Sequence, residues 1–196
     1  MAENRRDSLI DAAAELLDRG GPAAVTLREV GRAVGVSHNA PYRHFTDKDD
    51  LLAAIASREL RRHVSPRPGP TGEGTSEPTA RALMISYVRW ALRHPERFRL
   101  TFGRWTRDHA ELQAAADEAR ARLVDAVTRA QAASDLPAGD PERVTALLQA
   151  LAHGAADLAL SGHLAADGKG HAGPEELVAD LFGYLQAPTG TTARPR

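Results

Sequence analysis

The chain has 196 residues, a formal net charge of −1, 42% hydrophobic residues and no cysteine. This composition supplies enough apolar material for a buried core, and the lack of cysteine excludes disulfides, thiolate zinc sites and cysteine nucleophiles. Aromatic residues make up only 5%, and alanine and leucine are abundant, which favours helices over sheets.

The first residues contain no apolar stretch typical of a signal peptide. The uncharged run at residues 144–156 is too short and too polar to span a bilayer. We therefore expect a soluble, cytoplasmic, all-α protein.

The N-terminal part of the chain is predicted to begin with two helices. Apolar residues at helical spacing indicate a first helix from about Asn4 to Arg19, ended by the glycines and proline of residues 20–22. Thr26, with Glu29 three residues later, forms a capping box that begins a short second helix. Gly35 supplies the left-handed turn that ends this helix.

Two more helices are predicted to complete the N-terminal bundle. Ser37 can cap a third helix from His38 to about His44, and Asp47 can cap a fourth that extends to about His63. Asp49 and Asp50 lie in the first turn of the fourth helix, where the helix dipole favours negative charge.

The composition changes after residue 63. Residues 64–78 are rich in proline and glycine and contain little that can be buried, so they are predicted to form a linker or loop. Helical patterns then resume, and no strand is predicted. The further helices are expected at about residues 79–94, 95–107, 110–134, 141–162 and 174–186.

These elements predict about nine helices in two domains. Residues 1–63 are expected to form a helix-turn-helix headpiece built on three helices, and residues 79–187 a second helical domain. The last residues, 188–196, are expected to be disordered.

Residues 26–45 fit a helix-turn-helix, which needs two short helices, a tight turn and an outer face that enters a major groove about 12 Å wide. The alternative is a small helical bundle with a solvated polar face. If the segment reads DNA, three groups of residues are expected to contact it. His38, Asn39 and Arg43 would reach base edges, Tyr42 and His44 would contact phosphates or sugars, and Thr26, Arg28, Ser37 and Lys48 would hold phosphate near helix N-termini. Pro41 belongs to the same face and falls in the first turn of its helix, where the missing N–H costs little.

The run from Thr26 to Ser37, followed by Pro-Tyr-Arg-His-Phe-Thr-Asp-Lys-Asp-Asp-Leu-Leu, closely resembles the signature of the TetR (tetracycline-repressor-like) family. The resemblance covers most of residues 5–62, with a departure at Gly31, where the family usually has alanine. It implies a homodimer that binds an inverted repeat in double-stranded DNA and pairs through its last two helices. It also implies a repressor that a small molecule releases from its operator. Because the chain contains no glycine-rich phosphate loop, it is not expected to be an enzyme.

The C-terminal part resembles the WHG subgroup of this family. Residues 87–103 match the opening pattern of that subgroup, and residues 149–154 match a later one, with Gln149 where a tryptophan is usual. This implies a pocket for a small apolar or amphipathic ligand, although ordinary core packing remains the alternative for these side chains. The candidate pocket residues are Met84, Tyr87, Trp90, His94, Phe98, Phe102, Trp105, Gln149 and His153.

Two apolar stripes on the last two predicted helices suit a two-fold dimer interface, or alternatively plain core. The interface residues predicted from them are Val144, Leu148, Leu151, Ala155, Leu158, Leu177, Leu181, Phe182 and Leu185.

No cofactor or metal is expected. His153, His163 and His171 lack the i, i+4 spacing of a helical zinc site, and Ser161 lies in no strand–turn–helix elbow of a hydrolase. A second functional hypothesis keeps the TetR fold but replaces the small ligand with a protein partner that acts through the C-terminal domain.

Overall fold

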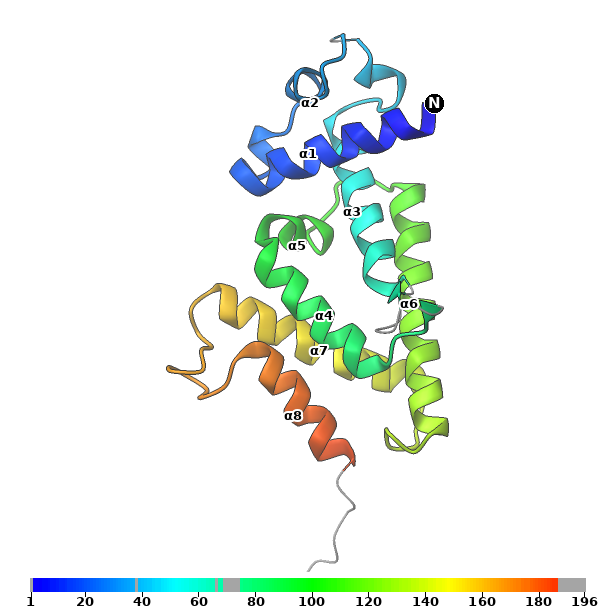
Figure 1. Ribbon diagram of the computed structural model, residues 1–196, viewed down its shortest axis with the longest axis vertical. Coiled ribbons are helices and arrows are strands. Elements are labelled where there is room, and N and C mark those ends of the chain that lie inside the picture. Colours follow the sequence, from blue (N-terminus) through cyan, green and yellow to red (C-terminus); the bar gives the residue numbers. More distant parts are fainter. Residues whose placement is uncertain (1, 38, 66, 69–74, 187–196) are drawn as a thin grey trace, which may run out of the picture. The chain divides into compact units, whose positions relative to one another are not determined.

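The computed structural model describes residues 2–37, 39–65, 67–68 and 75–186 (Figure 1). Within these ranges the chain forms eight α-helices, one 3-10 helix and one pair of two-residue strands, which confirms the all-α class. The helices are α1 (Ala2–Ala24), α2 (Leu27–Val34), η1 (Pro41–Arg43), α3 (Lys48–Val64), α4 (Ala80–Arg93), α5 (Pro95–Thr101), α6 (Ala110–Ala132), α7 (Pro141–Leu160) and α8 (Pro174–Gln186). The strands β1 (Arg67–Pro68) and β2 (Thr75–Ser76) pair antiparallel, a feature the sequence did not predict. The expected tail, 188–196, and the predicted base contact His38 lie outside the described residues.

The chain divides into two compact units. The first contains Met1–Ser65 and Trp90–Ala121, and the second contains Pro66–Arg89 and Arg122–Arg196. Helices α4 and α6 therefore contribute residues to both units. This division follows packing, whereas the domains predicted above follow the order of the chain.

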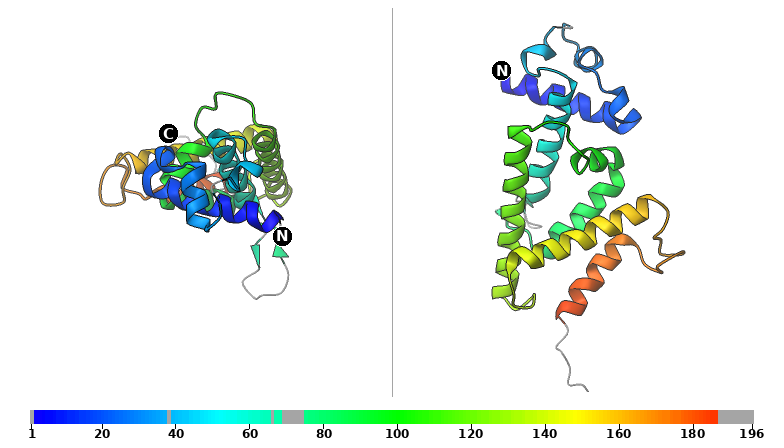
Figure 2. Two further views of the ribbon diagram at one scale, coloured as in Figure 1. Left: turned by 90° about the horizontal axis from the view of Figure 1, so that it is seen from above. Right: turned by 180° about the vertical axis from the view of Figure 1, so that it is seen from behind.

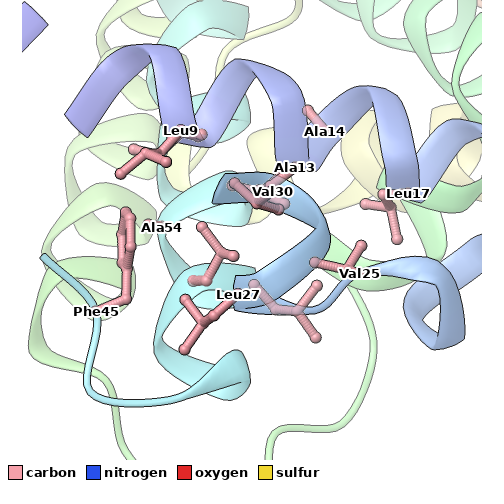
Figure 3. Close-up of a cluster of buried hydrophobic side chains, with 13 residues drawn as sticks. Leu9, Ala13, Ala14, Leu17, Val25, Leu27, Val30, Phe45 and Ala54 are labelled. Atoms are coloured by element: carbon pink, nitrogen blue, oxygen red, sulfur yellow. The ribbon is translucent and has the colours of Figure 1, made fainter. Parts of the chain in front are cut away.

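The core of the first unit forms where α1, α2 and α3 meet. Figure 3 shows its apolar side chains converging between these helices, with Phe45 from the segment that precedes α3. This arrangement confirms the apolar face predicted for the first helix. The largest fully buried members are Leu9, Ile10, Leu17, Val25, Val30, Phe45, Leu51 and Ile55.

Helix α1 is interrupted where the glycine pair was predicted to end it. Gly20 (φ −152°) and Gly21 (φ 64°) leave the helical region, and a short turn that contains Pro22 follows. Gly21 adopts a left-handed conformation that side-chain-bearing residues rarely tolerate. The predicted end near Arg19 is therefore confirmed for the straight part of the helix.

Helix α5 is shorter than the sequence predicted. It ends at Thr101 instead of about residue 107, and the Gly103 N–H bonds to the carbonyl oxygen of Leu100. A side chain at Gly103 would bring its Cβ within 2.7 Å of the Arg99 carbonyl oxygen. Such tight backbone packing requires glycine, and the chain continues as a loop to the start of α6.

In the second unit, α7 and α8 pack against each other (Figure 2). Leu148 and Ala155 of α7 and Val178 and Phe182 of α8 are buried there. Across the described ranges, no helix is both long and apolar enough to cross a membrane.

Candidate nucleic-acid interface

Helix α2 is capped at both ends, and its C-terminal cap forms the turn that follows it. The Thr26 side chain accepts a hydrogen bond from the Glu29 N–H at 3.1 Å, which confirms this half of the predicted capping box. The Glu29 carboxylate accepts from Arg32 Nη1 at 2.9 Å. Gly35 adopts the left-handed conformation (φ 71°) predicted for the helix end, and Val36 N–H bonds back to the Gly31 carbonyl at 2.9 Å.

The element that follows this turn differs from the prediction. The sequence predicted an α-helix from His38 to about His44, but the described residues form the three-residue 3-10 helix η1. Pro41 opens η1, and both His44 N–H and Phe45 N–H bond to its carbonyl oxygen at 3.0 Å. Phe45, which is fully buried in the core, then ends the segment, so the element stays a single short turn and does not continue as the predicted α-helix.

Pro41 is buried, whereas the other predicted DNA contacts that the structure describes are exposed or half-buried. Its ring lies against Gly31 of α2, where a Cβ would sit 3.1 Å from Pro41 Cγ. Gly31 thus lets the segment after the turn lie directly on α2. This close contact gives a packing reason for glycine at a position where the family usually has alanine.

We call residues 37–45 the recognition segment. Asn39, Tyr42 and Arg43 project from it into solvent, and the Tyr42 side chain is 56% exposed. Ser37 is exposed and His44 is half-buried. The segment contains no carboxylate, so its outer face is polar, aromatic and cationic. The flanking residues Thr26 and Arg28 are exposed, and Lys48 is half-buried.

An open hollow of about 720 Å³ lies beside the recognition segment. It is lined by Arg43, Ser37 and the end of α2, and also by Arg5 and Ser8 of α1. Arg5 and Ser8 were not predicted from the sequence, because the pairing of α1 with this turn is a tertiary contact. The adjacent Arg6 is engaged elsewhere: it pairs with Glu111 at 2.5 Å and lies over the Phe45 ring.

Models of known families match both parts of the chain. Residues 9–55 match the bacterial regulatory proteins of the tetR family, and residues 80–181 match the tetracyclin repressor-like C-terminal domain. The chain belongs to the TetR family. This is a family of regulators and not of enzymes.

Relatives of this TetR-family chain include a repressor and a helix-turn-helix transcriptional regulator. The class D tetracycline repressor of Escherichia coli is 40% identical over 63 residues, which are 32% of this chain and 29% of the repressor. AcrR of Shigella flexneri is 37% identical over 54 residues, 28% of this chain and 25% of AcrR. The chain therefore matches less than a third of the length of these curated relatives.

Two solved structures are similar over nearly the whole chain. A protein of unknown function from Rhodococcus sp. RHA1 is 32% identical, with a TM-score of 0.72 over 92% of this chain and 93% of that one. SmeT, the repressor of the Stenotrophomonas maltophilia multidrug efflux pump SmeDEF, is 27% identical, with a TM-score of 0.57 over 97% and 96%.

The predicted effector-pocket residues of this TetR-family chain are divided between the two units. In the first unit, Trp90 and Phe98 are buried and Phe102 is exposed. The Trp90 indole N–H donates to Glu59 Oε2 at 2.9 Å, so this ring already has a structural role. His94 is half-buried beside Asp18 at 3.2 Å, and Trp105 lines a hollow of about 410 Å³ with α3 and α5 residues.

In the second unit, Tyr87 and His153 form a polar pair, with the Tyr87 hydroxyl 2.8 Å from His153 Nδ1. Burial raises the pKa of Tyr87, so its hydroxyl stays protonated. Met84 is buried and Gln149 is half-buried. A separate hollow of about 360 Å³ is lined by α4, α6 and α8 residues, and none of the nine predicted pocket residues lines it.

The predicted dimer residues separate into two faces. Leu148, Ala155 and Phe182 are buried inside the second unit itself. The apolar side chains left exposed are Leu147 (70%) on α7 and Tyr184 (77%) on α8, together with the predicted Leu158. The remaining predicted members, Val144, Leu151, Leu177, Leu181 and Leu185, are half-buried. Sequence periodicity could not separate Leu147 from Leu148, since α7 is apolar on both sides.

Proposed function

We propose that the chain is a sequence-specific DNA-binding transcriptional repressor. The observation that carries this proposal is the outward projection of Asn39, Tyr42 and Arg43 from a segment held on a capped helix and turn. Amide and guanidinium groups suit base edges, and a phenol suits phosphate. A repressor must reach the DNA, so this role implies that the protein acts in the cytoplasm.

Selection of bound duplexes from a random DNA pool tests this proposal. We expect enrichment of an inverted repeat whose half-sites are about one helical turn apart, or a multiple of it. Recovery of no preferred sequence at physiological salt would contradict the proposal.

Arg5 is expected to add a phosphate contact at the hollow beside the recognition segment. Its side chain is exposed, and it has no ion-pair partner among the described residues. Arg5→Ala should lower the slope of log affinity against log salt concentration by about one per subunit. Titrations of labelled operator at several salt concentrations measure this slope.

Arg6→Ala is the matched control for the Arg5 variant. Arg6 is held by Glu111 and Phe45, so its loss should leave the slope unchanged. Equal slopes for wild type and Arg5→Ala would show that Arg5 does not contact DNA.

We further propose that α7 and α8 form the homodimer interface through a stripe of exposed and half-buried apolar side chains. Leu147, Leu151 and Leu158 share one side of α7, and Leu181 and Tyr184 share one side of α8. Solvent-exposed leucines at helical spacing favour pairing with a second copy of the same face.

Leu147→Glu should convert the dimer to a monomer at micromolar concentration, because the carboxylate would be buried without a partner. Sedimentation velocity measures the change in mass. Ala146→Glu is the control, since this residue is exposed on α7 but lies off the stripe. A Leu147→Glu protein that stays dimeric would exclude this interface.

We propose that a small apolar or amphipathic ligand releases the repressor from its operator. The contact between buried Tyr87 and half-buried His153 supports this reading, because it can fix the orientation of a ligand among apolar side chains. The alternative is control by a protein partner. Compounds that both raise the melting temperature of the protein and release bound DNA would support control by a small ligand. If no compound of a broad panel had either effect, control by a protein partner would be favoured.

A further inference from the structure

The loop between α5 and α6 binds the start of α3 through ion pairs, a contact that we call the grip of the loop on α3. Arg107 binds Asp47 through two parallel contacts, from Nη1 to Oδ2 at 2.9 Å and from Nη2 to Oδ1 at 2.7 Å. Arg107 Nε also lies 3.1 Å from Asp49 Oδ2. A bidentate guanidinium–carboxylate pair constrains direction as well as distance.

A second contact anchors the same loop. His109 Nε2 lies 2.9 Å from Asp49 Oδ2, and the His109 side chain is only 8% exposed. The Trp105 ring packs edge-on against His109 at 5.3 Å between centroids. The loop thus contacts two carboxylates at the start of α3, one at its N-cap and one in its first turn.

Asp47 links this grip to the recognition segment. It is the N-cap of α3, and its Oδ1 also accepts the Asp50 N–H at 2.9 Å. Only Thr46 separates Asp47 from Phe45, which ends the recognition segment. Hydrogen bonding to Arg107, and then to the Asp50 amide, lowers the pKa of Asp47, so the carboxylate is charged at neutral pH.

We propose that Arg107 and His109 are positioning residues for DNA binding, which hold the first turn of α3 and hence the recognition segment in the orientation that fits the operator. The inference rests on the proposed DNA-binding function. The gripping residues lie within the part that matches the C-terminal family model, and Asp47 and Asp49 lie within the part that matches the N-terminal one. The loop can therefore change operator affinity without touching DNA.

The ion pair between Arg107 and Asp47 is expected to affect the position of the recognition segment and not the overall stability of the fold. The side chains of Arg107 and Asp47 are each 45% exposed, and exposed ion pairs contribute little to the free energy of folding. A constraint on the start of α3 instead limits the conformations of the recognition segment, which favours binding.

Arg107→Gln, Asp47→Asn and the double variant form the test, with operator taken from the selection above. Asparagine still caps a helix, so Asp47→Asn removes the ion pair and keeps the cap. Each single variant should lose about fivefold to tenfold in operator affinity, and the double variant should lose no more than the larger single loss. The salt slope should stay at the wild-type value, since Arg107 makes no phosphate contact.

Arg104→Gln is the control in the same loop, because Arg104 is exposed and has no ion-pair partner in the described part of the chain. Its operator affinity should equal that of wild type. A salt slope reduced by about one in Arg107→Gln would overturn the proposal in favour of direct phosphate binding. Additive losses in the double variant, or unchanged affinity in both singles, would also overturn it.

Hydrogen exchange of the free protein supplies a readout that needs no DNA. Arg107→Gln should speed amide exchange at residues 42–52, while the melting temperature stays within about 2 °C of wild type. If wild type bound no duplex, the proposed function would fail, yet faster exchange would still show that the loop holds this segment. Unchanged exchange, or a fall in melting temperature that accounts for the lost affinity, would overturn the proposal.

Discussion

Replacing Arg43 with alanine and Tyr42 with phenylalanine together is expected to lower operator affinity at least about 100-fold. A good side-chain contact to a base edge discriminates by roughly 1–3 kcal/mol, and a dimer loses the contact in both half-sites. Both side chains are exposed, so the fold should be unaffected. Fluorescence anisotropy with labelled operator at physiological salt measures the loss.

Arg89→Ala is the control for this loss, because it removes one positive charge from the surface of the second unit, where Arg89 pairs with Glu175. It should bind the operator with nearly wild-type affinity. If the Arg43 and Tyr42 double variant also kept its affinity, the assignment of the recognition segment would be wrong.

Among the substitutions proposed for this protein, truncation of the Glu59 side chain is expected to cause the largest fall in the free energy of unfolding. The Glu59 side chain is 4% exposed and accepts hydrogen bonds from Trp90 Nε1 at 2.9 Å and from Arg97 Nη1 at 3.2 Å. Glu59→Ala leaves the buried indole N–H of Trp90 without its acceptor. It also removes one of the two carboxylates that pair with Arg97, whose ion pair with Asp18 remains. We expect the free energy of unfolding to fall by about 3 kcal/mol, measured by urea denaturation.

Two further variants separate the cause of this loss. Glu59→Gln keeps an acceptor and should cost about half as much as alanine. Glu29→Ala removes an exposed carboxylate that pairs with Arg32 three residues away, and should cost about 0.5 kcal/mol. A Glu59→Ala protein as stable as Glu29→Ala would show that the buried contacts of Glu59 contribute nothing to stability.

Local signals predicted most of the helices. Residues 174–186 were predicted as a helix with the bounds that α8 has, and Asp47 caps α3 as expected. Caps, glycines and prolines act within a few residues, so a single sequence contains the information needed to place them.

The remaining features depend on contacts between distant residues. The ion pair of Arg107 with Asp47 joins residues that are 60 positions apart in the sequence. The hydrogen bond from Trp90 to Glu59 joins residues that are 31 positions apart. No local pattern encodes either contact. The short 3-10 form of the recognition segment likewise depends on a tertiary contact, the burial of Phe45 in the core. For the same reason, the sequence predicted DNA contacts between Thr26 and Lys48 but gave no sign of Arg5, which only the folded chain brings to that face.

Photo-cross-linking of the selected operator tests the central claim most directly. A photoreactive base placed in each half-site should form adducts within residues 37–48, identified by mass spectrometry of the cross-linked peptides. Adducts found only elsewhere in the chain, with residues 37–48 unmodified, would contradict the account of how this protein reads DNA.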